Sequence, residues 1–123
     1  MRTGEALALV KPTATVMEAA LAMTNSKGGS AIVVDRAGRL AGIFTDGDFR
    51  RVMAKATDCN RQLSTAVEKV MTKSPSFVYD DAYAAELLKI FERRRIDDLP
   101  VCNRAGEVVG LVDIQDLPKM KVL

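Results

Sequence analysis

The sequence predicts an α/β fold built from two repeated units that are related by a pseudo-two-fold axis. The first observation is an internal repeat: when the sequence is aligned with itself at a shift of 68 positions, Gly42 matches Gly110 and no gap is needed. The second is the order of patterns: each unit shows helical spacing, then two short apolar runs around a glycine turn, then a second helix start. The third is length, since 123 residues suit one domain with a single core. Further matches at the same shift are Ala14 with Ala82, Glu18 with Glu86, Val33 with Val101, Asp48 with Asp116, and residues 36–38 with 104–106.

The first unit is expected to open with a helix. Thr15 and Glu18 have the spacing of a capping box, in which a hydroxyl and a carboxylate each bond a free amide at the helix start. The helix should run to about Ser26, where Gly28 and Gly29 should end it. Its buried face is expected to contain Val16, Ala19, Ala20 and Met23.

A hairpin and a second helix complete the first unit. Residues 30–35 are a β-branched run typical of a strand that is buried on both faces, and residues 40–44 should return as its partner. The glycine in the turn between them can take a positive φ. Thr45 or Asp46 should then cap a helix that reaches about Ala56.

The second unit repeats this order. Its first helix should span about residues 82–95, with Asp80 or Asp81 at its start. Its hairpin should pair residues 99–103 with residues 108–112. The buried face of the helix is expected to contain Ala84, Leu87, Leu88 and Phe91.

The domain organisation follows from the repeat. Residues 1–56 are expected to form the first repeat with its leading segment, and residues 72–123 the second. In the linker, residues 57–71, a polar loop over 57–64 should be followed by a helical turn within 65–71. Because the linker is short, the two halves should pack face to face as one module.

Composition argues against several classes of function. The net charge is +2 with acids and bases interspersed, which gives no strong field for nucleic acid or membrane. The chain lacks histidine, the commonest general base, and Cys59 and Cys102 lie in unrelated contexts that predict neither a metal site nor a disulfide. Apolar runs fall far short of the ~20 residues that span a bilayer. We therefore expect a non-catalytic, cytoplasmic protein.

Two strings give the chain a family resemblance. GIFTDGD at residues 42–48, with LPV at residues 99–101 of the other unit, resembles a tandem CBS domain over essentially the whole chain. A narrower match joins residues 1–4 to GIFTDGDFRR at residues 42–51, and it looks like the C-terminal CBS pair of bacterial arabinose-5-phosphate isomerases of the sugar isomerase family. The resemblance implies that this chain is the regulatory part of a longer protein with an N-terminal isomerase domain.

Thr45 and Asp48 are the leading candidates for ligand contacts. Thr45 stands where a strand meets a helix, so its hydroxyl and the free helix amides suit a phosphate oxygen. Asp48, one turn on, can accept from two ribose hydroxyls, and the resemblance assigns phosphate or ribose contacts to both positions. The alternative is that Thr45 is only an N-cap and that Asp48 only complements the helix dipole.

Other residues are expected to complete this cleft. The resemblance places opposite it the strand start of the other unit, residues 96–99, whose amides could read a base edge while an aspartate accepts from an exocyclic amine. One of the two arginines beyond Asp48 could reach an anionic group, and a solvated face or an ion pair is the equally weighted alternative. The predicted contacts besides Thr45 and Asp48 are Ile43, Arg50, Arg51, Ile96, Asp97, Asp98 and Leu99.

A pseudo-symmetric second cleft is predicted to be the weaker site. In it, Asp113 stands in the place of Thr45, while Asp116 keeps the acid of Asp48. A carboxylate at Asp113 repels phosphate, so this cleft is expected to stay empty or to bind a neutral polyol. Its remaining residues would be Gly29, Ser30 and Ala31.

The leading hypothesis for function is a regulatory module that binds a nucleotide or nucleotide sugar and controls the attached isomerase domain. The resemblance implies adenine nucleotides, AMP, ADP or ATP, because CBS pairs most often bind these. It also implies the pathway to the sugar acid Kdo and lipopolysaccharide, whose activated sugar CMP-Kdo is a second candidate ligand. A homodimer is expected, as for other CBS pairs. The rival hypothesis is a structural oligomerisation module that binds nothing.

Overall fold

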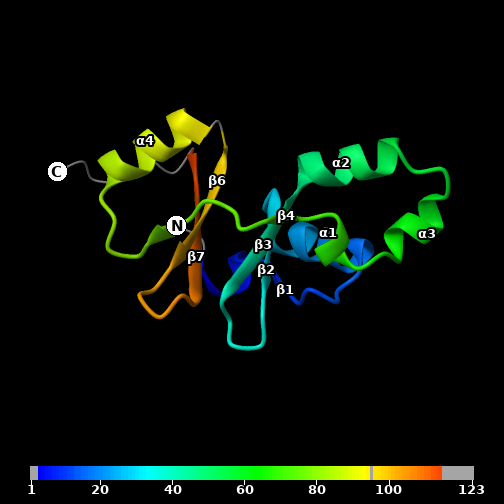
Figure 1. The fold of residues 1–123 in the computed structure, drawn as a ribbon, viewed down its shortest axis with the longest axis horizontal. Helices are drawn as coiled ribbons and strands as arrows, with labels where there is room; N and C mark the ends of the chain where they lie inside the picture. Colours follow the sequence, from blue (N-terminus) through cyan, green and yellow to red (C-terminus); the bar gives the residue numbers. More distant parts are fainter. Residues whose placement is uncertain (1–2, 95, 115–123) are drawn as a thin grey trace.

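Two small β-sheets with helices packed beside them form the molecule, so the predicted α/β class is confirmed (Figure 1). The computed structural model describes residues 3–94 and 96–114, and the predicted last helix and Asp116 lie outside them. The elements in chain order are η1 (Gly4–Ala6), β1 (Leu9–Val10), α1 (Val16–Ser26), β2 (Ser30–Val34), β3 (Leu40–Thr45), α2 (Asp46–Ala54), α3 (Cys59–Leu63), η2 (Val67–Lys69), β4 (Thr72–Lys73), β5 (Val78–Tyr79), α4 (Ala84–Arg94), β6 (Asp98–Cys102) and β7 (Val108–Asp113).

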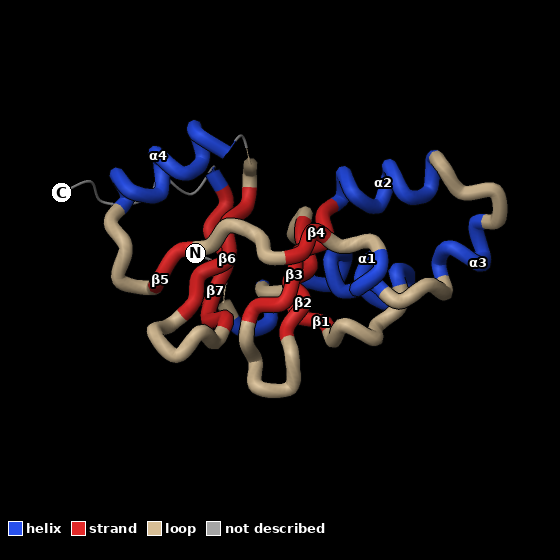
Figure 2. The backbone as a smooth tube through the Cα atoms, viewed as in Figure 1, coloured by secondary structure: helices blue, strands red, loops and turns tan. Residues whose placement is uncertain are grey.

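Each sheet is built around one of the predicted hairpins (Figure 2). The first has the strand order β1-β2-β3-β4 and the second β5-β6-β7. The hairpins β2–β3 and β6–β7 are antiparallel, whereas the short strands β1 and β5 run parallel to β2 and β6. Strand β4 opens the second repeat but pairs with β3 of the first, with Gly42 opposite Lys73. The start of the second repeat is therefore joined to the sheet of the first.

Contacts between equivalent residues mark the pseudo-two-fold axis. Ser30 and Asp98 are 68 positions apart, the offset of the repeat, and the Ser30 hydroxyl donates a hydrogen bond to the Asp98 carboxylate. Arg39 and Glu107 are separated by the same offset and form an antiparallel bridge. A residue can touch its own equivalent only near the axis that relates the two. The repeats therefore meet face to face, through both the strand starts and the hairpin turns.

The first repeat follows the predicted local structure closely. Helix α1 has the predicted capping box, in which the Glu18 amide donates to Thr15 Oγ1 at 3.1 Å and Glu18 Oε1 accepts from the Thr15 amide at 3.1 Å. The left-handed residue that ends α1 is Lys27, with φ of 57°, rather than either of the two glycines that follow it. Gly38 has the expected positive φ, 79°.

The linker contains a helix where a loop was predicted. Helix α3 begins after Asp58, whose carboxylate accepts from the Arg61 amide at 3.1 Å. It packs against α1 and α2. The segment is polar and short, so its sequence carries no helical periodicity, and packing on two other helices compensates for that. The turn predicted within residues 65–71 is the 3-10 turn η2.

Helix α4 starts later than predicted. It begins at Ala84, and Asp81, expected to cap it, instead forms a two-pronged ion pair with Arg104 at 2.8 and 3.0 Å. Leu87 and Phe91 are buried as predicted, but Leu88 is 45% exposed. The apolar stripe of this helix is therefore narrower than its sequence suggests.

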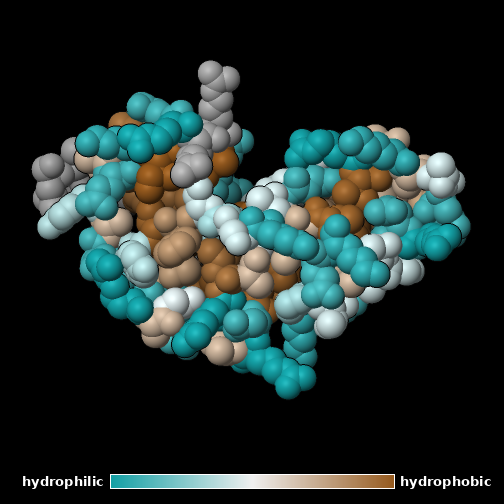
Figure 3. Space-filling model, viewed as in Figure 1, coloured by the Kyte–Doolittle hydropathy of each residue, from teal (hydrophilic) through white to brown (hydrophobic). Residues whose placement is uncertain are grey.

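Each repeat has its own hydrophobic core. In the first, Val16, Val33 and Phe44 are fully buried between α1 and its sheet. In the second, Leu99 and Phe91 are buried, with 0% and 2% of their surface exposed. The space-filling view shows the two halves as lobes separated by a notch between α2 and α4 (Figure 3). A site shared by both repeats must therefore lie where the lobes meet.

Candidate functional site

A cavity of about 870 Å³ lies between the two repeats. The antiparallel registers set Ser30 opposite Thr45 and Asp98 opposite Asp113, so both strand starts and both strand ends meet at one end of the sheets. Helix α2 begins at this same end. The volume lies within the range of about 300–1,000 Å³ that is usual for small-molecule sites.

The structure brings most of the predicted site residues together. Thr45 and Asp48 line the cavity, and Leu99 does not, because its side chain is fully buried in the second core. The other predicted contacts that line it are Ile43, Arg50, Arg51, Ile96, Asp97 and Asp98. In β6, the first residue, Asp98, thus lines the cavity, whereas the next residue, Leu99, is buried in the second core.

The described residues of the predicted second cleft are divided between this cavity and the buried interior. Gly29 and Asp113 line the same cavity as Thr45. Ser30 and Ala31 are buried, with 2% and 0% of their surface exposed. Gly29 and Asp113 therefore border the same space as Thr45, close to the hydrogen bond between Ser30 and Asp98, and Asp116 lies outside the described residues.

The start of α2 shows the capping arrangement in full. The Asp48 amide donates to Thr45 Oγ1 at 3.1 Å, and Asp48 Oδ2 accepts from the Thr45 amide at 3.0 Å. Asp48 Oδ1 accepts from the Arg51 guanidinium at 2.7 Å. The capping interpretation is thus confirmed, and the ion pair considered for Arg51 is present. A ligand contact by Thr45 or Asp48 remains a prediction.

Little of the helix start is left for an anion. The Asp46 amide donates to the carbonyl of Gly29 at 2.9 Å, and the Asp48 amide is held by Thr45. The Gly47 amide is the remaining one of the first three in α2, and Gly47 lines the cavity. The Arg51 guanidinium lies over this residue, 3.3 Å from the position that a Cβ would occupy. One amide and one guanidinium therefore make up a small anion-binding corner.

The opposite wall of the cavity is acidic. Burial raises the pKa of Asp98 to about 6, and the hydrogen bond from Ser30 partly opposes that shift. A hydrogen bond with Asp113 and the charges of Asp113 and Asp97 contribute to the same rise in the pKa. Asp98 and Asp113 face each other across β6 and β7, so a proton can be shared between the two carboxylates.

The sequence analysis missed one wall of the cavity. Thr72 and residues 74–76, from β4 and the segment after it, line the cavity beside α2. They lie there because β4 pairs with β3 of the other repeat. Asp46, Pro100 and Ile114 also line the cavity. No pattern in the sequence signalled this wall, because the pairing of β4 with β3 joins residues of different repeats.

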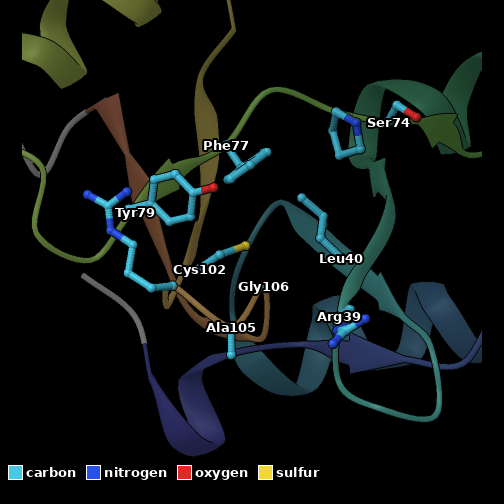
Figure 4. A pocket seen from close by; sticks show the side chains of 10 residues that line it. Arg39, Leu40, Ser74, Phe77, Tyr79, Cys102, Ala105 and Gly106 are labelled. Atoms are coloured by element: carbon cyan, nitrogen blue, oxygen red, sulfur yellow. The ribbon is translucent and has the colours of Figure 1, made fainter.

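A second cavity, of about 450 Å³, lies at the hairpin turns and was not predicted (Figure 4). The rings of Phe77 and Tyr79 meet edge to face, with centroids 5.4 Å apart and planes at 85°. The Arg104 guanidinium lies over the Tyr79 ring at 4.1 Å. Burial raises the pKa of the Cys102 thiol beside them. Ser74 and Pro75 line both cavities, so this segment forms the wall between them.

Fold and cavity together define a module of two repeats that meet around one ligand-sized space. The family model for the CBS domain matches residues 4–55 and 67–119. The chain therefore belongs to the CBS domain family, with two copies of the domain.

The relatives that are similar over the whole chain are much longer proteins. Arabinose 5-phosphate isomerase KdsD of Pseudomonas aeruginosa is 37% identical over 123 residues, which are all of this chain and 37% of that protein. KdsD of Francisella tularensis is 34% identical over 122 residues, 99% of this chain and 36% of that protein. The chain thus spans just over a third of the length of these relatives.

Solved structures of CBS proteins share the fold. A CBS-domain containing protein of Agrobacterium tumefaciens is 28% identical with a TM-score of 0.79, and the match covers 94% of this chain and 90% of that one. A CBS domain protein of Pyrobaculum aerophilum, complexed with AMP, is 24% identical with a TM-score of 0.82, over 94% and 84% of the two chains.

Within residues 3–94 and 96–114, every helix is too short or too polar to cross a membrane. Over the same part of the chain, no three His, Cys, Asp or Glu side chains are grouped so as to hold a metal ion.

Proposed function

We propose that this chain is a regulatory module that binds an adenine nucleotide between its repeats and controls a sugar-phosphate isomerase domain of the same polypeptide. One observation supports this above others. The Thr45–Asp48 helix start of one repeat faces the strand start of the other, Asp97 and Asp98, across a cavity large enough for a nucleotide. A ligand held there contacts both repeats at once, so its binding can change how they sit together.

The lining suits the parts of an adenine nucleotide. Ile43, Ile96 and Pro100 offer apolar contacts to a base. Carboxylates such as Asp97 accept from an exocyclic amine or from ribose hydroxyls. The Gly47 amide and the Arg51 guanidinium suit one anionic oxygen. AMP is the first choice of ligand because it is bound by the Pyrobaculum protein, which has the same fold.

The relatives support the role of the whole protein. Similarity to the KdsD isomerases extends over all of this chain and only a third of theirs, which fits a regulatory part attached to an isomerase domain. A place in the pathway to Kdo belongs to the same proposal, and CMP-Kdo is the alternative ligand. The chain by itself should show no isomerase activity, and turnover near that of a full-length isomerase would contradict its regulatory role.

Titration calorimetry with AMP tests the proposal. Asp48→Ala should weaken binding about 10- to 100-fold, the scale for a lost hydrogen bond to a charged group. Glu18→Ala is the matched control, since it breaks the same capping box in α1, away from the cavity. It should lower stability by a similar amount and leave the affinity for AMP unchanged.

The same calorimetry distinguishes the two candidate ligands from each other and from the absence of any ligand. If CMP-Kdo displaces AMP and binds more tightly, the nucleotide sugar replaces AMP as the proposed ligand. If neither compound binds the parent chain, the ligand-binding function is wrong and the structural oligomerisation module takes its place.

A further inference from the structure

We infer that the cavity accepts one adenosine or nucleoside monophosphate per chain and rejects nucleoside di- and triphosphates, because the acidic residues of the second repeat form its far wall. This inference rests on the proposed function and specifies the ligand class of that site. The residues that carry it are Asp97, Asp98 and Asp113 on one side, and Gly47 and Arg51 on the other.

The charges of the cavity favour ligands with little negative charge. Among the described residues that line it, Asp46, Asp48, Asp97, Asp98 and Asp113 are acids, whereas Arg50 and Arg51 are the bases. Arg51 is already paired with Asp48 at 2.7 Å. Each further phosphate adds negative charge in a partly enclosed space where like charges repel more strongly than in water. The affinity should therefore fall as phosphates are added.

Hydrogen-bonding capacity leads to the same ligand class. Ionised carboxylates only accept hydrogen bonds, and a phosphate chain brings almost nothing but acceptors. Adenosine brings donors, namely two ribose hydroxyls and an exocyclic amine, which an acidic wall can bind. The amides of Asp46 and Asp48 are already bonded, so the first turns of α2 offer the Gly47 amide, the Arg50 guanidinium and the exposed part of Arg51 as donors.

The two repeats differ in the polar side chains that they place at the cavity. This difference is the reason to expect one nucleotide per chain. Where the first repeat has Thr45 opposite Ser30, the second has Asp113 opposite Asp98. The second half therefore has two carboxylates where the first has two hydroxyls. Asp113 lines the same cavity as Thr45, so a nucleotide held by the first half meets the acids of the second, and within residues 3–94 and 96–114 the place equivalent to Thr45 is a carboxylate that repels a second phosphate.

The test is a calorimetric series with adenosine, AMP, ADP and ATP at pH 7.5 and fixed salt. For the parent chain we expect a stoichiometry of one and an affinity for ATP at least tenfold weaker than for AMP. Asp113→Thr, which copies Thr45 into the second repeat, should strengthen ATP binding about fivefold or more and thereby narrow the ratio of AMP to ATP affinity. Asp98→Asn should act in the same direction.

A control variant tests whether the change in ATP affinity comes from an acid in the cavity or from the net charge of the chain. Glu92→Gln removes one acid from the exposed face of α4, outside the cavity, and should leave the ratio of AMP to ATP affinity unchanged. Parent affinity for ATP equal to or above that for AMP, or a ratio unmoved by Asp113→Thr, overturns the inference while the proposed function stands. If no adenine compound binds, both are overturned.

Discussion

At the scale of single residues, the sheet edge next to the cavity depends on a glycine. Gly42 is buried in β3 opposite Lys73 of β4, and a Cβ at this position would lie 2.8 Å from the carbonyl oxygen of Thr72 and would also overlap the Met71 side chain. Only a residue without a side chain lets β4 come this close. The wall of the cavity that follows β4 is therefore positioned by Gly42.

Gly42→Ala should destabilise the fold by about 2 kcal/mol or more, because the clash is with backbone that has to move. Chemical denaturation measures the loss, and hydrogen exchange should show faster exchange of the β3–β4 amides than of the β6–β7 amides. A loss below about 0.5 kcal/mol would mean that β4 is not held against β3 in the way described.

Asp98 should make stability depend on pH. Its pKa is raised from 3.8 to about 6, so the folded chain holds this proton over a range where the unfolded chain has released it. The contribution is favourable below about pH 4 and is lost as the pH rises to about 6. The ionisable groups that face it are Asp97 and Asp113, with Asp46 on the other side of Gly29.

Asp98→Asn should remove this slope. It should stabilise the fold at neutral pH by about 1–2 kcal/mol, a value reduced from the full shift because solvent screens part of the charge. Melting temperatures of the parent and the variant between pH 4 and pH 7 test this. Parallel curves over that range would show that Asp98 titrates normally.

At the scale of elements, helices α1 and α2 begin in the same way but differ in their surroundings and in how they end. Helices α1 and α2 have the same capping box, yet only that of α2 lies in the cavity. Their C-termini differ, since Lys27 takes a left-handed conformation after α1 and Lys55 a right-handed one after α2. The two lysines therefore form a natural pair for testing backbone strain.

Lys27→Gly should stabilise the chain by about 0.5–1 kcal/mol, because glycine adopts a φ of 57° without the penalty of a Cβ. Lys55→Gly, at a φ of −92°, should instead be neutral or destabilising, since glycine only adds freedom to the unfolded chain. Urea denaturation of both variants decides the point. Equal effects at the two positions would contradict the role of the left-handed residue.

At the scale of the whole molecule, the repeats meet around a polar axis and leave apolar side chains outside. Leu21 on α1 is 53% exposed, and Leu88 on α4 is 45% exposed. Large apolar side chains exposed on helices favour association with another surface. The expected homodimer would cover such residues.

Sedimentation equilibrium should show a dimer for the parent chain at micromolar concentrations. Leu88→Lys should shift the equilibrium toward the monomer without unfolding the chain, because the side chain is half exposed in the monomer. A parent chain that stays monomeric up to millimolar concentration would rule out the dimer.

The sequence by itself determined the repeat, the hairpins, the capping boxes at Thr15 and Thr45, and the choice of Thr45 and Asp48 as candidates. These features depend on residues a few positions apart, so their patterns can be read along the chain. The polar helix α3 is the local exception, since its stability comes from packing on α1 and α2.

Only the tertiary structure decided which side chains share the cavity. It placed Gly29 and Asp113 of the second predicted cleft beside Thr45, buried Leu99 in the core, and paired β4 with β3 of the other repeat. It also set Asp98 against Asp113 and Ser30, which raises the pKa of Asp98. Each of these depends on how two surfaces 68 positions apart meet at an axis, and a pattern within one repeat contains no information about the distance between them.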